Sequence, residues 1–504
     1  NGVRVLRGYS DKYGLLIRGP AGVGKSCLAG KLIERFPNKE LVVFHGELKK
    51  ANILRKLRQL FDKKGVEAGL RVIKSELEYE DRIKELFRSV FKQLRTLIYF
   101  DDFEQNLDRK GDDYWVKPEV IETIKPILYA LEWSEGQTNL MITSRYPFIM
   151  EVEGENLPAK YLEDLTLMSC KGADLEKKKN ELLNISKSKH SQLYLEFGKG
   201  NPRLLEWLDK IAEEEEKYNL KQLKQALQGK NEDYIREYLA EILAKTEGED
   251  FLQFLRRAAV FRLPVQQSAF EKFGDKEFLD KGVNLTLFER EKPSGLEPVY
   301  WVAPIIREAE WRKLPKKEKL TMHDSAFKWY DKKITESKEP NFAYLNEAVL
   351  HALESNRVLG ACKHAIPLGD YLSDLLLYQE QFILQQRIID RISNHVVSEA
   401  IEKKDPSVAN LYNNFGSLCQ DLGDAKKAVQ YFEKALEIDL NIFGDKHPKV
   451  VEKYYIMGEI CKSSGDKNKA IKYYEKTVEI VKTVLGNNHP FTQEVQKKLD
   501  ELKE

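Results

Sequence analysis

Eight residues near the N-terminus have types and spacing suited to binding phosphate. Residues 19–26 read Gly-Pro-Ala-Gly-Val-Gly-Lys-Ser and fit the pattern G-x-x-x-x-G-K-[ST]. In such a loop, successive backbone N–H groups, a helix N-terminus and the Lys25 ammonium meet the negative charges of a nucleotide phosphate chain. Gly22 and Gly24 let the backbone approach the phosphate oxygens, and the Ser26 hydroxyl suits Mg²⁺. The pattern predicts a nucleotide-binding loop; the alternative is a glycine-rich turn that matches by chance.

The segments on either side of this loop predict the elements that would position it. Residues 13–17 are an apolar run of the kind that forms a buried strand. The residues after the loop carry an apolar face with helical spacing, made by Leu28, Leu32, Ile33 and Phe36. Strand, loop and helix in this order are the context that the phosphate-binding pattern requires.

Two acidic residues predict the second half of the site. Residues 97–100 are an apolar strand that leads into Asp101 and Asp102. In an open parallel α/β sheet, ligands bind at the C-terminal ends of the strands. We therefore expect Asp101 to hold Mg²⁺ through its water shell and Asp102 to orient or deprotonate the attacking water. The alternative is a plain strand followed by an Asx turn.

A further apolar strand is predicted to deliver an arginine to the same edge. Residues 139–143 lead into Ser144 and Arg145. Arg145 is expected to reach the γ-phosphate, a charge-assisted contact of about 1.5–3 kcal/mol, and a solvated loop arginine is the alternative. Residues 41–45 predict another strand, and residues 160–162 a last one that closes the sheet.

The composition indicates a helix-rich protein of several domains. The 504 residues are 32% charged and 42% hydrophobic. The 82 basic and 81 acidic side chains give a net charge of +1, so we expect neither nucleic-acid nor membrane binding. The five cysteines and eight histidines show no metal-binding spacing, which indicates a cytoplasmic protein without a structural metal. The chain begins with Asn1 rather than Met, which suggests a fragment.

Helices and then a hairpin are predicted after the sheet. Residues 175–227 read as successive amphipathic helices. Residues 285–288 and 299–302 predict a β-hairpin, joined by a charged turn that contains residues 293–295. Helices followed by such a hairpin indicate a winged helix. Its segment 271–281 mixes both charge signs, so we expect it to clamp the nucleotide rather than to bind DNA.

The C-terminal part repeats with a period of 42 residues. Pro406, Pro448 and Pro490 follow this spacing, and such a period means stacked helical hairpins. Cys419 and Cys461 occupy the same place in their repeats, so we predict that both pack inside the hairpins. The other pairs at this spacing include Gly416 and Gly458, Gly423 and Gly465, Ala428 and Ala470, and Tyr431 and Tyr473.

These repeats resemble tetratricopeptide repeats. The His-Pro turns at residues 447–448 and 489–490 are similar to those of the longer repeats in kinesin light chains. The resemblance implies a concave surface that binds proteins or peptides. Residues 340–400 predict one or two degenerate hairpins of the same kind. The tetratricopeptide spacing is matched by Tyr412, Phe415, Gly416, Ala428, Phe432 and Ala435.

The motifs of the N-terminal half, taken together, resemble those of STAND signalling NTPases, relatives of the NB-ARC proteins. They are the phosphate loop, residues 97–102 and residues 142–145. The sequence of residues 101–106 is similar to that of bacterial members. This class implies an ADP/ATP switch with slow hydrolysis, in which the first acidic residue serves the metal and the strand-end arginine senses the γ-phosphate. Residues 200–202 resemble the G-x-P motif of the class, which implies that Pro202 packs on adenine. An ordinary proline in the first turn of a helix is the alternative.

One position departs from the NB-ARC pattern. There, a histidine after the hairpin contacts the ADP β-phosphate, whereas this chain carries Ala303. Residues 322–324, Met-His-Asp, match the tripeptide of that family but lie in the middle of a predicted helix. We therefore expect His323 to be a helix-packing residue. Arg307 or Trp301 is the expected replacement in holding ADP.

We therefore predict a multidomain protein of class α/β plus all-α. A P-loop NTPase domain with a parallel sheet is expected at residues 1–155, a helical domain at 156–245 and a winged helix at 246–335. Degenerate helical repeats are expected at 336–400, and a tetratricopeptide solenoid at 401–504.

The predicted site has three sets of residues. Catalysis is assigned to Lys25, Asp102 and Arg145, and Mg²⁺ to Ser26 and Asp101. Binding of ATP or ADP is assigned to Gly22, Val23, Gly24, Lys25, Ser26, Cys27 and Pro202.

The predicted function is that of a switch with slow ATPase activity. We expect a protein or peptide trigger on the concave face of the repeats and self-association through the nucleotide domain on ATP binding. An effector upstream of Asn1 or on another protein would act in bacterial immunity or signalling. The alternatives are a transcription regulator of the same class, a repeat scaffold with an inactive nucleotide site, and a fast AAA-type motor.

Overall fold

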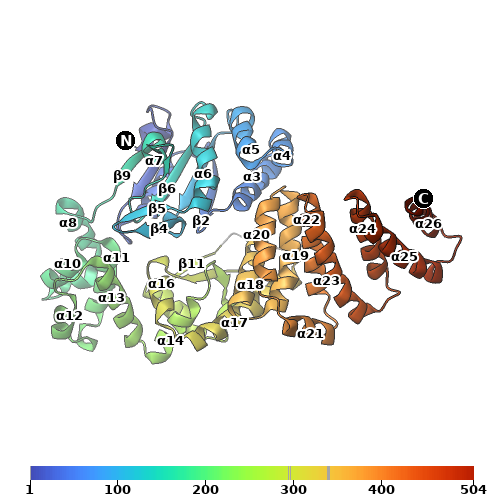
Figure 1. The fold of residues 1–504 in the computed structure, drawn as a ribbon. Helices are drawn as coiled ribbons and strands as arrows, with labels where there is room; N and C mark the ends of the chain where they lie inside the picture. The colour runs from blue at the N-terminus through green and yellow to red at the C-terminus, as the bar shows by residue number, and fades with distance from the viewer. Residues whose placement is uncertain (1, 293–294, 296, 338–340) are drawn as a thin grey trace. The chain divides into compact units, whose positions relative to one another are not determined.

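The chain folds into two compact units, which are described separately. The computed structural model describes residues 2–292, 295, 297–337 and 341–504, and the two units are Asn1–Pro315 and Lys316–Glu504 (Figure 1). The predicted turn at Pro293 and Ser294 lies outside the described residues.

A five-stranded parallel sheet forms the centre of the first unit. Its strand order is β2-β3-β6-β1-β9, and every neighbouring pair is parallel. All residues of β6 and nearly all of β3 are buried, as expected for parallel strands covered on both faces. The predicted parallel α/β sheet is thus confirmed. The strands are β1 (Gly14–Arg18), β2 (Glu40–His45), β3 (Thr96–Asp101), β6 (Thr138–Ser144) and β9 (Leu162–Thr166).

Helices cover the two faces of this sheet. On one face, α1 and α2 contribute Val5, Leu6, Ala29 and Leu32 to an apolar cluster with side chains of β1, β3 and β6. Figure 1 shows α3, α4 and α5 together beside the sheet. These helices are α1 (Gly2–Leu6), α2 (Lys25–Ile33), α3 (Lys50–Lys64), α4 (Glu67–Ile73), α5 (Tyr79–Glu85) and α6 (Pro118–Ala130), with a short hairpin of β4 (Leu107–Lys110) and β5 (Asp113–Val116) before α6.

The last strand begins later than predicted. Of the predicted residues 160–162, only Leu162 lies in β9, because Leu157–Tyr161 form the short helix α7 with Pro158 in its first turn. The sheet therefore extends past the predicted domain boundary at residue 155. The other predicted domain boundaries stay predictions.

Helices α8 to α13 follow the sheet, as the amphipathic pattern predicts. The helix that matters most for the site is α11, because its first residue, Pro202, follows the Gly-Asn pair of the predicted motif. Asn201 caps this helix by accepting hydrogen bonds from the backbone N–H groups of Arg203 and Leu204. The six helices are α8 (Gly172–Glu181), α9 (Leu183–Lys187), α10 (Ser191–Gly198), α11 (Pro202–Glu213), α12 (Leu220–Leu227) and α13 (Glu232–Thr246).

A small antiparallel sheet completes the first unit. Its order is β10-β12-β11, and the predicted hairpin is present as the antiparallel pair of β11 and β12. The first hairpin strand was predicted at residues 285–288 but begins only at Phe288, because the chain turns at Thr286, whose φ is 56°. The elements are α14 (Glu249–Ala258), β10 (Val265–Gln266), α15 (Glu277–Asn284), β11 (Phe288–Glu291), β12 (Val299–Val302) and α16 (Pro304–Lys313).

The second unit is helical among its described residues. Its first helix, α17 (Lys316–Glu336), carries His323, whose Nδ1 lies 2.8 Å from Nδ1 of His351 on α18. His323 is therefore a helix-packing residue, as predicted. The remaining helices are α18 (Phe342–Glu354), α19 (Val358–Asp374), α20 (Tyr378–Ile389), α21 (Asn394–Glu402), α22 (Ser407–Asp421), α23 (Ala425–Phe443), α24 (Pro448–Ser463), α25 (Lys467–Val484) and α26 (Pro490–Lys503).

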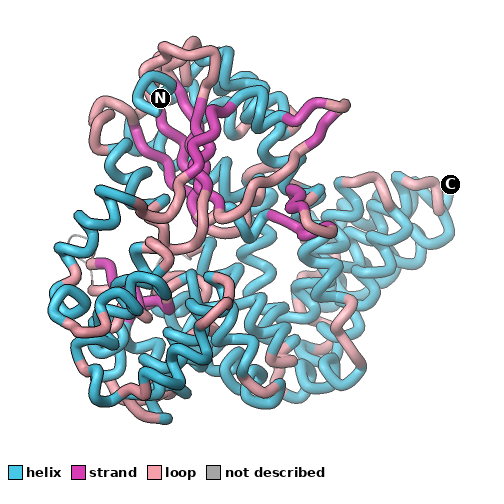
Figure 2. The backbone as a smooth tube through the Cα atoms, turned by 90° about the vertical axis from the view of Figure 1, so that its left-hand side faces the viewer, coloured by secondary structure: helices cyan, strands magenta, loops and turns pink. Residues whose placement is uncertain are grey.

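The 42-residue period follows from close contacts inside each hairpin. A Cβ on Gly416 would lie 3.2 Å from the Phe432 ring, and one on Gly458 would lie 2.9 Å from the Tyr474 ring. Cys419 is buried against the same interior, and burial raises the pKa of its thiol, so its predicted packing role is confirmed. Figure 1 shows α22 to α26 following one another in chain order, and Figure 2 shows that the chain ends in helices joined by short loops.

One buried ion pair interrupts this apolar pattern. Lys453 Nζ of α24 donates to Asp439 Oδ2 of α23 at 2.5 Å, and both side chains are almost fully buried. One period later, the equivalent positions hold Val481 and Val495. No helix in the described part of the chain is long and apolar enough to cross a membrane.

Candidate functional site

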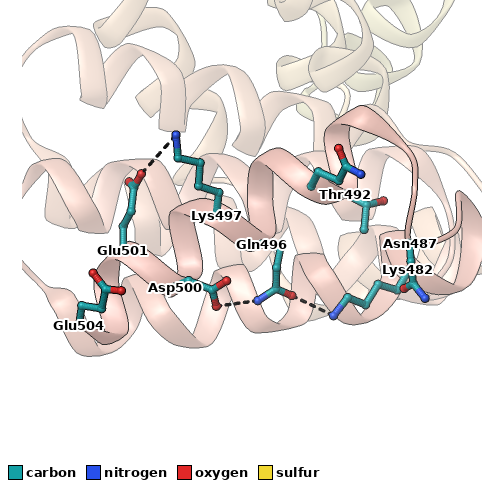
Figure 3. A pocket seen from close by; sticks show the side chains of 9 residues that line it. Lys482, Asn487, Thr492, Gln496, Lys497, Asp500, Glu501 and Glu504 are labelled. Atoms are coloured by element: carbon teal, nitrogen blue, oxygen red, sulfur yellow. Dashed lines mark hydrogen bonds and ion pairs between the residues drawn. The ribbon is translucent and has the colours of Figure 1, made fainter.

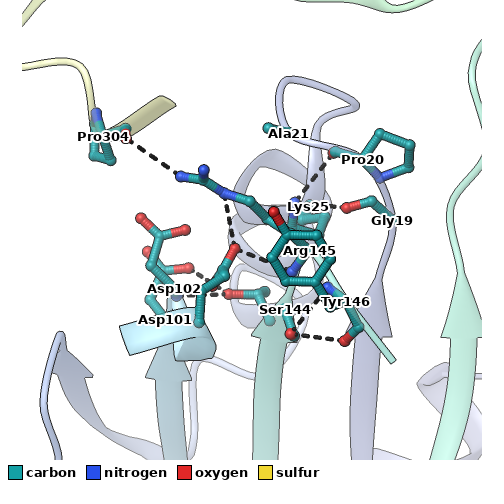
Figure 4. A network of polar contacts seen from close by, with 12 residues as sticks. Gly19, Pro20, Ala21, Lys25, Asp101, Asp102, Ser144, Arg145, Tyr146 and Pro304 are labelled. Carbon is teal, nitrogen blue, oxygen red and sulfur yellow. Dashed lines mark hydrogen bonds and ion pairs between the residues drawn. The ribbon is translucent and has the colours of Figure 1, made fainter. Parts of the chain in front are cut away.

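The strand order brings the three predicted motifs to one edge of the sheet. The strand β6 lies between β1 and β3, so the residues that follow β6 lie between those that follow the other two strands. The phosphate loop follows β1, the acidic pair ends β3, and Arg145 follows β6. Figure 4 shows these side chains gathered at that edge.

The phosphate loop needs its glycines for their backbone conformation. Gly19, Gly22 and Gly24 have φ values of 154°, 82° and 96°, where a residue with a side chain is strained. No heavy atom of another element lies within 4 Å of where a Cβ on Gly24 would stand, so the space over this residue is open. The helix α2 begins directly after Gly24, and its first N–H groups are therefore available to an anion.

Lys25 lies across the loop. Its side chain is buried, and its Nζ donates to the carbonyl oxygens of Gly19 at 2.9 Å and Pro20 at 3.1 Å. Burial lowers the pKa of Lys25, and the Glu104 carboxylate acts in the opposite direction. An ammonium buried at a glycine-rich loop is suited to the charge of a phosphate chain.

Asp101 lies next to the hydroxyl group of Ser26. Ser26 Oγ is 3.2 Å from Asp101 Oδ1, which also accepts from Tyr99 at 2.5 Å and Thr143 at 2.6 Å. Burial opposes ionisation of Asp101, but hydrogen bonds from His45, Thr143 and Tyr99 outweigh it and lower its pKa to about 2. A permanently ionised carboxylate beside a hydroxyl offers the oxygen ligands that Mg²⁺ prefers, so these two residues fit the predicted ion.

Asp102 is held in a strained conformation at the end of β3. Its φ of 53° lies in the left-handed region, which is uncommon for a residue with a side chain. Its backbone N–H donates to Thr143 Oγ1 at 3.1 Å. Burial raises the pKa of Asp102, and the charge of Asp101 raises it further.

Arg145 contacts two other parts of the first unit. Its Nε lies 2.9 Å from Glu104 Oε1, and its Nη2 donates to the carbonyl oxygen of Pro304 at 3.3 Å. Its backbone N–H donates to the same oxygen of Glu104 at 3.0 Å. Arg145 is therefore not a solvated loop side chain in this structure.

The motif that contains Pro202 packs directly on the phosphate loop. Asn201 Nδ2 donates to the carbonyl oxygen of Ala21 at 2.8 Å, and the N–H of Arg203 donates to that of Gly22 at 3.4 Å. A Cβ on Gly22 would lie only 2.6 Å from the Cβ of Arg203. Pro202 thus stands beside the loop, while its contact with adenine stays a prediction.

The other predicted residues have different surroundings. Val23 is buried, whereas Cys27 is exposed on the first turn of α2. Ala303 is fully buried before α16. Arg307 Nη1 donates to the carbonyl oxygen of Ala259 at 3.5 Å, and Trp301 faces Glu289 across the pair of β11 and β12. The role of Arg307 or Trp301 in holding ADP stays a prediction.

Sequence reasoning did not assign a role to three residues of this site. Glu104 and Thr143 were part of quoted motifs. Thr143 is a polar residue at the end of a predicted strand, which is a usable signal, whereas Glu104 lies three residues after Asp101. Asn201 was read only as part of a Gly-Asn-Pro motif. Its hydrogen bond to Ala21 joins positions 180 residues apart, and no local sequence pattern predicts this bond.

A comparison with protein families identifies the repeats. The sequence model of the tetratricopeptide repeat family matches residues 407–491, so the predicted tetratricopeptide repeats are confirmed there. No curated protein matches the chain.

Solved structures match more of the chain. One is a Signal Transduction ATPase with Numerous Domains (STAND) that has a tetratricopeptide repeat sensor, from Pyrococcus horikoshii. It covers 99% of this chain and 79% of its own, at 14% identity and a TM-score of 0.49.

Two further matches cover parts of the chain. A putative kinesin light chain repeat protein of Podosopora anserina covers 37% of this chain and 85% of its own, at 15% identity and a TM-score of 0.27. The ORC1 protein of Aeropyrum pernix, solved with DNA, covers 61% and 88%, at 11% identity and a TM-score of 0.28.

A separate pocket of about 390 Å³ lies in the second unit, between α25 and α26 (Figure 3). Charged and amide side chains line it, and Gln496 bridges Lys482 and Asp500 by hydrogen bonds. The full lining is Lys482, Asn487, Thr492, Gln493, Gln496, Lys497, Asp500, Glu501 and Glu504.

Proposed function

We propose that this chain is a nucleotide-operated switch of the STAND kind. It binds ADP or ATP at the phosphate loop, hydrolyses ATP slowly and recognises a protein or peptide through its tetratricopeptide repeats. ATP binding promotes self-association through the nucleotide-binding unit and activates an effector, in bacterial immunity or signalling.

The observation that carries this proposal is the packing around Gly22. A Cβ on Gly22 would lie 2.6 Å from Arg203 Cβ on α11 and 3.3 Å from Ile305 Cδ1 on α16. The phosphate loop, the helical part and the part with the small sheet therefore meet at one residue of the loop. A nucleotide at this loop lies beside all three parts, so its phosphates can act on the contacts between them.

The electrostatics of the small sheet support the same proposal. Burial raises the pKa of Glu289 on β11; Arg203 lowers it, and Asp102 raises it. Glu289 is therefore close enough to the site to respond to its charges. A change of phosphate charge at the loop would therefore also change the electrostatic environment of Glu289 on β11.

The predicted catalytic and metal-binding residues each have a role in this mechanism. Lys25 and Arg145 bind phosphate oxygens, and Asp102 orients or deprotonates the attacking water. Ser26 and Asp101 would hold Mg²⁺, which neutralises charge on phosphate oxygens when it is bound.

The energies indicate that nucleotide alone does not complete the switch. Shifting an equilibrium from 1:99 to 99:1 takes about 5.5 kcal/mol of differential binding. Contacts of the γ-phosphate with Lys25 and Arg145 supply about 1.5–3 kcal/mol each. Two such contacts only just reach the required value, so the proposal includes a contribution from a partner bound to the repeats.

Three measurements on residues 1–504 test this function. MgATP and MgADP should each raise the unfolding temperature of the first unit, and light scattering should detect larger assemblies with MgATP. Turnover of ATP should be well below roughly 1 per second, because slow hydrolysis keeps the ATP-bound state of the switch long-lived. Absence of any shift with either nucleotide, or fast turnover, would overturn the proposal.

The role of Asp102 has its own test. Asp102→Ala should leave ATP bound but unhydrolysed, so that assemblies formed with MgATP persist longer than those of the parent chain. Asp112→Ala, on the exposed turn between β4 and β5, is the control and should hydrolyse ATP at the parental rate. Parental hydrolysis by Asp102→Ala would show that the assignment of this carboxylate is wrong.

A further inference from the structure

Arg145 is hydrogen-bonded on two sides. Glu104 Oε1 accepts from its Nε at 2.9 Å and from its backbone N–H at 3.0 Å. The carbonyl oxygen of Pro304 accepts from its Nη2 at 3.3 Å. Figure 4 shows the guanidinium between the acidic residues after β3 and Pro304. The side chain predicted to sense the γ-phosphate thus already has an anionic partner.

Glu104 differs from the neighbouring Asp101 in how its oxygens are used. Asp101 Oδ1 is the shared acceptor of Tyr99, Thr143 and Ser26. Oε1 of Glu104 accepts hydrogen bonds from Arg145. Its buried Oε2 has no hydrogen-bond partner among the described residues. Burial disfavours the charge of Glu104, and Arg145 is the nearest compensation for it. The pair is therefore mutually dependent, because either charge alone would be buried without its main partner.

Pro304 is the first residue of α16, and that helix end touches the phosphate loop. The next residue, Ile305, places its Cδ1 3.3 Å from where a Cβ on Gly22 would stand. Arg145 thus reaches the backbone of α16 at the point where this helix meets the loop.

The other end of α16 is held by buried charges. Glu310 is fully buried and pairs with Arg256 of α14 at 3.3 Å and with Lys313 at 2.7 Å. Lys313 also pairs with Glu241 of α13 at 2.9 Å. Only two residues, 314 and 315, separate the end of α16 from α17, the first helix of the second unit.

We propose that Glu104 and the Pro304 carbonyl form a clamp on Arg145, and that Arg145 must leave this clamp to bind the terminal phosphate of a nucleoside triphosphate. Glu104 is a positioning residue that sets how strongly the chain prefers a triphosphate to a diphosphate. Release of Arg145 removes a hydrogen bond from the first residue of α16 and loosens this end of the helix. This inference rests on the proposed function and adds the residue and the helix through which the terminal phosphate acts.

Glu104→Gln in residues 1–504 tests the clamp. The amide can still accept from Arg145 but has no charge, so Arg145 is released more easily. The ratio of the affinity for a non-hydrolysable ATP analogue to that for ADP should rise about tenfold, with ADP affinity unchanged. Hydrogen exchange of α16 amides with ADP bound should also rise to the level of the parent chain with the ATP analogue.

Asp164→Asn is the matched control. It removes a carboxylate that Arg18 binds on the neighbouring strands, at 2.7 Å and outside the loop, and it should change neither readout. Parental values of the affinity ratio and of α16 exchange in Glu104→Gln would overturn the inference. If Glu104→Gln fails to fold, Arg145→Lys replaces it: faster α16 exchange with ADP bound supports the clamp, and parental exchange overturns it.

Failure of the proposed function would look different. If the parent chain binds neither nucleotide, the switch is wrong, whereas the clamp still predicts faster α16 exchange in Glu104→Gln without nucleotide. If the parent binds both nucleotides and Glu104→Gln changes nothing, the switch stands and only the clamp is wrong.

Discussion

The two units bury charged side chains in different ways. In the first, five ionisable groups gather around one loop, with a strained Asp102 and a carboxylate oxygen of Glu104 that has no described partner. In the repeats of the second unit, the Asp439–Lys453 pair occupies positions where the next repeat has Val481 and Val495.

This contrast separates two reasons for burying charge. Around the phosphate loop, exchanging the groups for apolar residues would remove the ligand site itself. In the repeats, the next interface shows that an apolar pair is compatible with the same helix packing. The charges around the phosphate loop are thus explained by ligand binding, and the buried pair of the repeats is replaceable in principle.

Breaking the buried pair of the repeats should have the largest effect on stability. Lys453→Met leaves Asp439 buried without its partner and should cost about 3–5 kcal/mol in local stability. Native-state hydrogen exchange of α23 and α24 amides measures this loss. The double change Asp439→Val with Lys453→Val copies the next interface and should recover the parental value or exceed it. A double variant as unstable as the single one would contradict the contrast.

Lys25→Ala should have the next largest effect, confined to the first unit. With nucleotide at one hundred times its dissociation constant, the parent chain gains about 2.7 kcal/mol, and the variant should gain nothing. Thermal unfolding with and without MgATP measures the difference. Lys31→Ala is the control, because Lys31 lies exposed on the same helix and pairs only with Glu34 in the described contacts. A nucleotide shift retained in Lys25→Ala would refute the assigned role.

Gly22→Ala should cost more than glycine replacement at an open position. Both Gly22 and Gly65 have positive φ, 82° and 65°, so alanine at either is strained by about 1–2 kcal/mol. Only at Gly22 would the new Cβ also meet Arg203, because nothing lies within 4 Å at Gly65. The excess loss of unfolding free energy in Gly22→Ala over Gly65→Ala measures the contact between loop and α11. Equal losses would remove the evidence for it.

The smallest expected effect is a pH dependence in the network around α16. Burial acts against the charge of Glu241, but hydrogen bonds from Lys245 and Lys313 lower its pKa from 4.5 to about 2. Since the folded-state pKa is depressed, this stabilisation is present above about pH 4.5 and is lost as the pH falls towards 2. Acid unfolding of the first unit should therefore be shallower in Glu241→Gln. The same profile in both proteins would show that Glu241 does not contribute.

The sequence predicted elements well where a single local pattern determines them. The strand β3 is built around a continuous apolar run, β6 has an apolar centre with polar ends, and recurring prolines and glycines mark the repeats. The late start of β9 was missed, because residues 157–161 suit both a strand and the short helix that Pro158 initiates.

The partners within the site were harder to predict than its members. The motifs named Lys25, Asp101 and Arg145, and strand order then brought them together. The pairing of Arg145 with Glu104 and Pro304 depends on how three parts of the chain pack, which no local pattern encodes. Local motifs therefore identify the residues of the phosphate site, whereas the packing of the chain determines which other groups bind those residues.

The place of β6 in the middle of the sheet has a consequence for how this chain can evolve. The strands on both sides of β6 fix its register. An insertion of one residue within β6 would therefore move each side chain after it, including Ser144, to the other face of the sheet. The turn between β4 and β5 is exposed and has no such constraint. Length changes should therefore accumulate in that turn among descendants of this chain, while β6 keeps its seven residues.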